Sequence, residues 1–263
     1  MAYKIVIANQ KGGVAKTTTA VNIADALKFM GYNVLLLDLD PQCNSTSVFI
    51  DSVENEKTIL DVFLKKEIIR DCIKHTDFGD VVCGSKDLAN SEDMFMRAAG
   101  GLKIIKNALK DIEDVYDFIV MDTPPNCGAF MRNGLFAADG IITPIQAKKF
   151  ALDGLSDFLD TVELLKDDGN ENLQILGILL TMYDQRNKQD RDVIKELPEI
   201  GKQLGIRIFK KPIRINQAIE NALADSKSLF LTKSNSNGAN DYADLVCEVL
   251  EIISKEDADN ECA

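Results

Sequence analysis

Short apolar runs alternate with amphipathic stretches along most of the chain. The apolar runs are rich in Ile, Val and Leu and are flanked by turn residues, which is typical of buried strands. We expect strands at residues 4–8, 34–38, 118–122, 140–144 and 173–180. Apolar residues at helical spacing predict helices at 17–30, 151–165 and 190–204, and Gly31 provides a stop after the first.

This alternation predicts an α/β fold whose mostly parallel, twisted sheet is flanked by helices on both faces. The sequence has no internal repeat and no long linker, so we expect a single domain over residues 1–255. Residues 51–101 are the least regular part and are expected to form helices and a short strand at one edge. The acidic residues 256–263 are expected to form a frayed, disordered tail.

Composition limits the classes of protein to which the chain can belong. The chain has 263 residues, of which 46% are hydrophobic and 27% charged, as in ordinary globular proteins. No apolar run approaches the roughly eighteen residues that cross a bilayer, and the first nine residues do not resemble a signal peptide. We therefore expect a cytoplasmic protein.

Metal and nucleophile chemistry based on cysteine or histidine is disfavoured. The six cysteines are scattered without a Cys-x-x-Cys spacing, which favours reduced cysteines in a core over a zinc or iron–sulfur site. The only histidine, His75, lies in the hydrophilic stretch 74–77, where a surface loop is expected. A catalytic triad cannot be built around it.

Charge is unevenly distributed along the chain. The formal net charge is −12, yet residues 202–233 carry a local net charge of +5, which leaves −17 for the remainder. Such a segment is either a solvated face or a surface that binds a polyanion. Its cations are Lys202, Arg207, Lys210, Lys211, Arg214, Lys227 and Lys233.

A glycine-rich loop follows the first expected strand and opens the first expected helix. Small residues there let consecutive backbone N–H groups converge on phosphate oxygens, and the helix N-terminus adds partial positive charge. Lys16 is expected to pair with the β- and γ-phosphates of a nucleotide, and the Thr17 hydroxyl to bind Mg²⁺. The loop reads Lys11-Gly12-Gly13-Val14-Ala15-Lys16-Thr17-Thr18.

Three carboxylates follow strands that should end near this loop. Asp38 and Asp40 end the second expected strand, and Asp122 ends the strand at 118–122. Ligands gather at the carboxyl ends of parallel strands, so these groups are expected beside the phosphate loop. Together they suggest a magnesium shell and a carboxylate that orients the attacking water.

These motifs resemble those of ParA/Soj partition ATPases, in the ParA/MinD class of P-loop NTPases. The loop at 11–18 resembles the deviant Walker A motif of that family, Leu37-Asp38-Leu39-Asp40-Pro41-Gln42 its Walker A′ motif, and Val120-Met121-Asp122-Thr123-Pro124-Pro125 its Walker B motif. The resemblance covers roughly residues 1–231. It implies a homodimer with ATP sandwiched between the protomers.

The family pattern implies roles for individual residues. Lys11 matches the signature lysine that reaches the partner's phosphates, and Asp40 matches the residue that positions the water. Asp38 and Asp122 match the magnesium environment, while Pro212, in the matching Pro212-Ile213-Arg214 segment, is expected at the nucleotide.

Three positions depart from the family pattern. Ala15 stands where most relatives have glycine; it is tolerated if its backbone is helical and otherwise weakens nucleotide binding. Cys43 replaces another frequent glycine, which affects only loop flexibility. Lys148 stands where many relatives have an acid, so local contacts there are expected to differ.

Features that are missing narrow the class further. Residues 241–263 contain one lysine and eight acidic residues, unlike the basic amphipathic helix that takes MinD-like relatives to membranes. The sequence has no close pair of cysteines like those of iron–sulfur relatives, and because the phosphate loop begins at residue 11 we expect no N-terminal helix-turn-helix like that of long plasmid forms. The short Soj-like type remains, which implies an ATP-bound dimer on the nucleoid that binds double-stranded DNA non-specifically with a ParB-type partner.

The DNA surface is expected within the basic segment, and alternatives stay open. We favour Arg207, Lys210, Lys211 and Arg214 as DNA contacts, with Lys227 and Lys233 as additions, although Arg214 could instead lie near the nucleotide base. A different function is an ATP-dependent scaffold that positions a protein cargo with little turnover. A third is an amide-forming metabolic ATPase, for which the sequence offers no recognisable substrate pocket.

Overall fold

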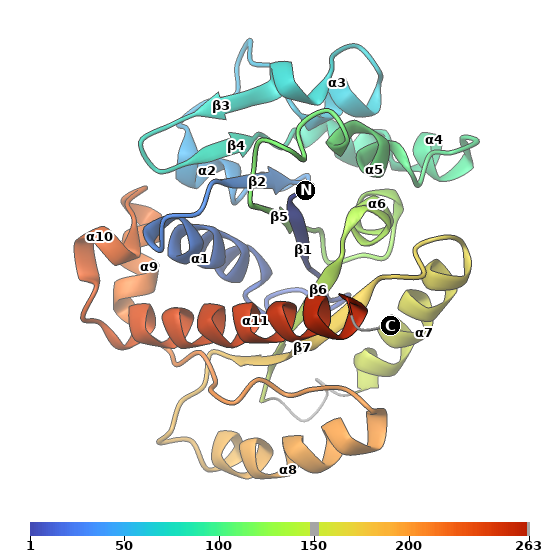
Figure 1. Ribbon diagram of the computed structural model, residues 1–263. Coiled ribbons are helices and arrows are strands. Elements are labelled where there is room, and N and C mark those ends of the chain that lie inside the picture. The colour runs from blue at the N-terminus through green and yellow to red at the C-terminus, as the bar shows by residue number, and fades with distance from the viewer. Residues whose placement is uncertain (148–152, 262–263) are drawn as a thin grey trace.

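The computed structural model describes residues 1–147 and 153–261, and within them one sheet runs through the centre of the molecule (Figure 1). Its strand order is β3-β4-β2-β5-β1-β6-β7, and only the β3–β4 pair is antiparallel. The strands are β1 (Tyr3–Ile7), β2 (Val34–Asp38), β3 (Ile73–His75), β4 (Asp80–Val82), β5 (Phe118–Asp122), β6 (Gly140–Gln146) and β7 (Gln174–Thr181).

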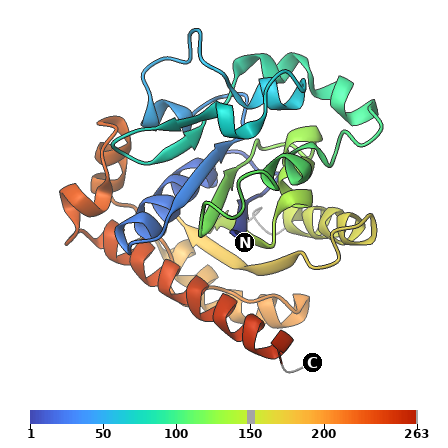
Figure 2. The ribbon, with the colours of Figure 1, turned by 45° about the horizontal axis from the view of Figure 1, so that its top comes forward.

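Helices cover both faces of this sheet (Figures 1 and 2). One face packs against α1 (Lys16–Phe29), α9 (Gln217–Ala224), α10 (Leu229–Lys233) and α11 (Asn237–Glu261). The other packs mainly against α3 (Ile59–Phe63), α5 (Ile104–Leu109), α6 (Ala129–Ala137) and α7 (Asp153–Asp167). The remaining helices are α2 (Thr46–Phe49), α4 (Glu92–Arg97) and α8 (Lys188–Leu204), with 3₁₀ turns at Ile69–Cys72 and Lys86–Asn90.

Side chains of the central strands alternate between two hydrophobic cores. Ile5 and Ile7 of β1 belong to the core under α1 and α11, whereas Val6 belongs to the core under α6. All three are fully buried, which is why the central strands are apolar on both faces. Because β1, β2 and β5 are parallel, the polar residues at their carboxyl ends meet at one edge.

The predicted fold class is confirmed, and most expected elements agree with the structure within two residues. The irregular region does supply the sheet edge, although with two strands, β3 and β4, instead of one. His75, expected in a loop, ends β3 with an exposed side chain. Lys148 and the first residues of the helix expected at 151–165 lie outside the described residues.

The C-terminal region is more regular than expected. Helix α11 continues to Glu261, through most of the segment expected to be a disordered tail. Among the described helices, none has the length and apolar character that crossing a membrane requires.

Candidate functional site

The loop at residues 11–18 lies between β1 and α1, where its ends are held by neighbouring strands. Asn9 donates from its side-chain amide to the carbonyl of Pro144 in β6, and its side-chain oxygen accepts the backbone N–H of Lys11. Thr181 at the end of β7 donates to the carbonyl of Val14 at 3.0 Å. The loop is therefore fixed against the carboxyl ends of β6 and β7, and α1 begins directly after it.

Ala15, which stands where most relatives have glycine, has a left-handed backbone conformation. Its φ and ψ are 64° and 35°, and it is the N-cap of α1. An L-residue with a Cβ is disfavoured there by about 1–2 kcal/mol, so the structure adopts the conformation that we expected to be the less favourable one. Cys43, the second departure, is also left-handed, with φ of 54°.

Lys16 is a buried cation at the start of α1. Its Nζ donates to the carbonyl of Lys11 at 3.0 Å. Burial lowers the pKa of its ammonium, and the nearby carboxylates of Asp122 and Asp40 oppose that decrease. A buried ammonium with a backbone oxygen as its recorded partner is suited to an incoming anion.

Asp122 is a buried carboxylate without a hydrogen bond. Both of its oxygens lack a partner, as does the buried hydroxyl of Ser45. Burial raises the pKa of Asp122 well above its ordinary value, and the adjacent Asp38 adds to the increase. The hydroxyls of Thr17 and Ser45 oppose it in part, although neither reaches hydrogen-bond geometry. Unpaired buried oxygens of this kind fit a hard divalent cation such as Mg²⁺.

Asp38 differs from Asp122 although the two are neighbours across β2 and β5. Its Oδ1 accepts the backbone N–H of Asp40 at 3.1 Å, and its Oδ2 accepts both the N–H and the hydroxyl of Thr46, at 2.8 and 2.6 Å. The Thr46 hydroxyl in turn accepts the N–H of Gly84 at 2.8 Å. Asp38 thus holds the loop that carries Asp40, and both its oxygens are in use.

Asp40 is buried at the start of that loop. Its Oδ1 accepts the backbone N–H of Gln42 at 2.9 Å, and its carbonyl accepts the N–H of Cys43. Its charge acts on Lys16, so the structure brings these two predicted residues together. For the partly buried ammonium of Lys11, no hydrogen bond or ion pair is recorded within the described part of the chain.

A small pocket of about 100 Å³ lies beside the start of α1. Its lining includes Ala15 and Thr18 from the loop, Met182 after β7, and Arg214 and Asn216. Pro212, predicted at the nucleotide, lines an adjoining groove of about 600 Å³, and Arg214 lines both. Met182 and Asn216 were not among the predicted site residues, although Asn216 lies two residues after the segment 212–214 that matches the family.

The segment 207–216, hereafter the basic strap, runs along the outer edge of β7. Phe209 donates its N–H to Ile178 at 3.0 Å, and Ile213 donates to Leu180 at 2.8 Å. Phe209 and Ile213 are four residues apart on the strap, whereas their partners Ile178 and Leu180 are only two residues apart on β7. The residues between these two contacts bulge from the sheet edge, and two of them are exposed lysines.

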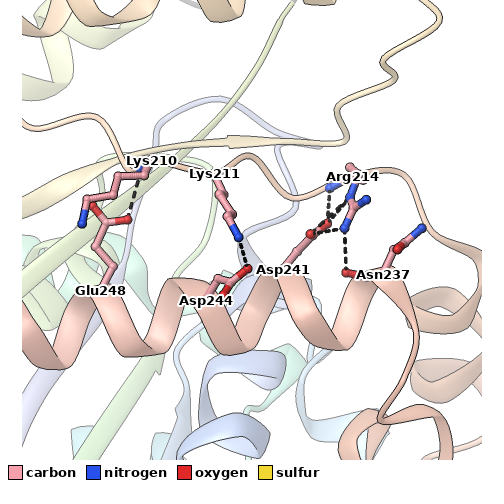
Figure 3. Close-up of polar contacts among 7 residues, drawn as sticks. All are labelled: Lys210, Lys211, Arg214, Asn237, Asp241, Asp244 and Glu248. Atoms are coloured by element: carbon pink, nitrogen blue, oxygen red, sulfur yellow. Dashed lines mark hydrogen bonds and ion pairs between the residues drawn. The ribbon is translucent and has the colours of Figure 1, made fainter.

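Three cations of the basic strap contact acidic side chains of α11 (Figure 3). Lys211 Nζ lies 2.7 Å from Asp244, and the Arg214 guanidinium lies 2.6 Å from Asp241. The backbone N–H of Lys210 donates to a Glu248 oxygen, and its ammonium lies 3.8 Å from Glu251. We call the four acids the acidic stripe: Asp241, Asp244, Glu248 and Glu251.

The other predicted DNA contacts are dispersed. Arg207 is exposed at the start of the strap. Lys227 pairs with Asp225 at 3.8 Å, and Lys233 ends α10, which packs on α1. The six predicted cations therefore belong to two segments.

Comparisons with known proteins agree on a family. A family model described as an AAA domain matches residues 2–175. Sporulation initiation inhibitor protein Soj of Bacillus subtilis is 37% identical over 252 residues, which covers 95% of this chain and 98% of that protein. Chromosome partitioning protein ParA of Caulobacter vibrioides is 33% identical over 251 residues, which covers 94% and 93%.

Solved structures show the same fold. The structure of cobyrinic acid a,c-diamide synthase from Mycobacterium smegmatis, with a bound ATP analogue and magnesium, superposes with a TM-score of 0.82. The two chains are 31% identical, and the match covers 95% of each.

Proposed function

The chain belongs to the ParA/Soj family of partition ATPases, and from this premise we propose that its ATP-bound homodimer binds double-stranded DNA without sequence preference. The protein is an ATPase that uses ATP and Mg²⁺. A ParB-type partner triggers hydrolysis and release, so that a chromosome, plasmid or mobile element is segregated on the nucleoid. The observation that supports the nucleotide site is the unpartnered carboxylate of Asp122 beside the buried ammonium of Lys16, and the exposed lysines of the basic strap support the DNA contact.

The nucleotide site has a separate role for each charged group. Residues 12–18 supply backbone N–H groups at the N-terminus of α1, and Lys16 supplies the cation for the β- and γ-phosphates. Thr17 and Asp122 offer oxygens to Mg²⁺, which neutralises phosphate charge when it is bound. Asp38 belongs to the same magnesium environment and holds the loop of Asp40.

Asp40 is the residue that we assign to the attacking water. It is a buried carboxylate held at the end of β2, next to Lys16. A carboxylate there accepts a hydrogen bond from water and orients it toward the γ-phosphate. Lys16 stabilises the charge that develops on the phosphate oxygens.

Lys11 connects nucleotide state to assembly. Its ammonium is the cation that we assign to the partner protomer's phosphates. Contacts of this kind across a dimer favour the closed state while the γ-phosphate is present, and hydrolysis removes them. Two basic straps then lie on one dimer, which raises the effective concentration of the second strap once the first has bound DNA.

Light scattering with ATP and Mg²⁺ tests this cycle. We expect the wild type to form a dimer and Lys11→Ala to bind ATP while remaining monomeric. Lys110→Ala, which removes an exposed lysine directly after the last residue of α5, is the matched control and should dimerise normally. An ATP-dependent dimer of Lys11→Ala would contradict the assigned role of Lys11.

The second candidate is an ATP-dependent scaffold that positions a protein cargo with little turnover. ATPase assays with and without random-sequence duplex and partner separate the two functions. Stimulated turnover supports partition, whereas slow turnover that neither DNA nor partner changes supports the scaffold.

A third candidate is an amide-forming synthase, favoured only by the 31% identity to such an enzyme. A groove of about 820 Å³ is lined by residues of the α3–α5 region, including Ile68, Ile104 and Asp111, and not by the phosphate loop. Product analysis with ATP and an amide donor would detect this activity.

A further inference from the structure

The acidic stripe is a continuous feature of α11. Its members, Asp241, Asp244, Glu248 and Glu251, are spaced by three, four and three residues, which places them on one face of the helix. That face lies against the basic strap (Figure 3).

The stripe cancels the charge that the sequence assigns to the strap. The strap carries four cations, Arg207, Lys210, Lys211 and Arg214, and the stripe carries four carboxylates. Three of the cations contact the stripe. The local excess of positive charge therefore exists along the sequence but not on the folded surface at this place.

The contacts are of two kinds. Arg214 makes several hydrogen bonds to Asp241, whose side chain is only 4% exposed, and the Arg214 side chain is itself 36% exposed. Lys210 and Lys211 are 74% and 64% exposed. Exposed pairs of this kind contribute about 0–1 kcal/mol each, so water and salt already compete with them. The hydrogen bonds between the Arg214 guanidinium and the buried Asp241 carboxylate are much harder to replace by contacts with phosphate.

We propose that the acidic stripe is a built-in competitor of DNA phosphates for the basic strap, and this inference rests on the proposed binding of DNA. The Lys211 ammonium leaves Asp244 and the Lys210 ammonium leaves Glu251 when they bind phosphate, whereas Glu248 keeps the backbone N–H of Lys210. Arg214 keeps its contact with Asp241 and holds the strap in place beside the pocket at α1. The stripe thereby lowers DNA affinity and makes stable binding depend on two straps in one dimer.

Salt dependence distinguishes this competition from a simple effect of net charge. A free lysine that binds a phosphate releases a cation from DNA, which steepens the dependence of affinity on salt. A lysine that first leaves a carboxylate frees that carboxylate to take up a cation, which offsets the release. The wild type should therefore have a shallower salt dependence than its number of phosphate contacts implies.

The test compares DNA affinity across a salt titration, with random-sequence duplex, ATP and Mg²⁺. The double variant Asp244→Asn/Glu251→Gln keeps an oxygen that accepts hydrogen bonds at each position but removes the two charges that pair with the Lys211 and Lys210 ammonium groups. We expect binding roughly three- to tenfold tighter than that of the wild type. The slope of log affinity against log salt should steepen by about 1 to 2 units.

A matched control separates local competition from overall charge. Asp114→Asn/Glu171→Gln makes the same chemical changes at exposed acids outside the stripe and strap. It should leave the salt slope unchanged and alter affinity by less than the stripe variant does. A stripe variant that behaves like this control, in both affinity and slope, overturns the proposal.

A further pair of variants separates failure of this inference from failure of DNA binding itself. If the wild type binds DNA and Lys210→Glu/Lys211→Glu binds it equally well, DNA binds at another surface. The proposed competition between stripe and DNA is then wrong. If neither wild type nor stripe variant binds DNA, the proposed DNA function fails and takes the inference with it. Binding by the stripe variant alone supports the inference.

Discussion

At the phosphate loop the charged groups are buried and some have no partner, whereas at the basic strap they are mostly exposed and paired. Asp122 and Lys16 illustrate the first arrangement, Lys211 and Asp244 the second. A buried unpaired charge costs stability, so a ligand that supplies the missing partner should stabilise the loop region. An exposed pair costs little to break, so a ligand at the strap must displace the partner that is already there.

Substitution of Asp40 should have the largest effect, and it tests whether the loop region hydrolyses ATP with Asp40 orienting the water. Asp40→Ala should lower ATP turnover by about 10²- to 10⁴-fold, because the water loses the carboxylate that orients it. ATP affinity should stay near that of the wild type, since Lys16 and residues 12–18 are unchanged, and the ATP-bound dimer should persist. Single-turnover hydrolysis together with calorimetric ATP binding checks this, and turnover near the wild-type rate would sink the assignment.

Substitutions at Asp122 and Asp241 compare a buried carboxylate that has no partner with one that is paired. Asp122→Asn should raise the free energy of unfolding of the nucleotide-free protein by roughly 1–3 kcal/mol at neutral pH, because it removes a buried charge without a partner. Asp241→Asn should lower it by about 1 kcal/mol, because Arg214 loses its charged partner. Urea denaturation of both variants checks these opposite signs.

The pH dependence of Asp122→Asn follows from the direction of the pKa shift. The pKa of Asp122 is raised in the folded protein, so the folded state holds its proton more tightly than the unfolded state. Wild-type stability therefore falls as pH rises above the ordinary carboxyl range, and the advantage of Asp122→Asn should vanish below about pH 4. An advantage that persists unchanged at low pH would mean that charge is not its cause. The variant should also lose most of the stabilisation by ATP and Mg²⁺.

Substitutions at Thr46 test whether the hydrogen bonds inside the loop region position Asp40. The Thr46 hydroxyl joins Asp38 to the N–H of Gly84, and Asp38 holds the N–H of Asp40. Thr46→Val keeps the shape and removes the hydroxyl, so kcat should fall about tenfold while the KM for ATP changes little. Thr46→Ser should restore kcat because it keeps the hydroxyl. Equal kcat values in the two variants would contradict the positioning role.

The two regions also differ in how far the sequence predicts them. The loop at 11–18 and Asp122 follow from short motifs at the ends of apolar strands, because parallel strands bring their ends together whatever the details of packing. The acidic stripe was visible only as an acidic C-terminal segment. Its contact with the strap joins residues 27 to 41 positions apart, such as Arg214 with Asp241 and Lys210 with Glu251. No local pattern encodes that contact, and charge counted along the sequence therefore overstated the surface charge.

Differences between residues within the motifs were harder to predict than the motifs themselves. The sequence left the place of Arg214 open, and the structure puts Arg214 in the lining of both the pocket beside Ala15 and the groove that Pro212 lines. Asp38 and Asp122 look alike in sequence, yet one is saturated with hydrogen bonds and the other has none. The partner that distinguishes them, Thr46, lies eight residues from Asp38 and carries no motif of its own.

Ala15 gives the smallest expected effect and tests strain in the loop region. Ala15 has φ of 64°, where glycine avoids the clash of a Cβ but loses more conformational entropy on folding. Relief of the Cβ clash outweighs the entropy loss, so Ala15→Gly should raise the free energy of unfolding by about 0.5–1 kcal/mol and tighten ATP binding slightly. Ala108→Gly, inside helix α5, is the matched control and should instead lose up to about 1 kcal/mol. If both substitutions destabilise the protein equally, the alanine at the loop is not strained; opposite signs would mean that this chain retains a strained residue at the point where its phosphate loop becomes a helix.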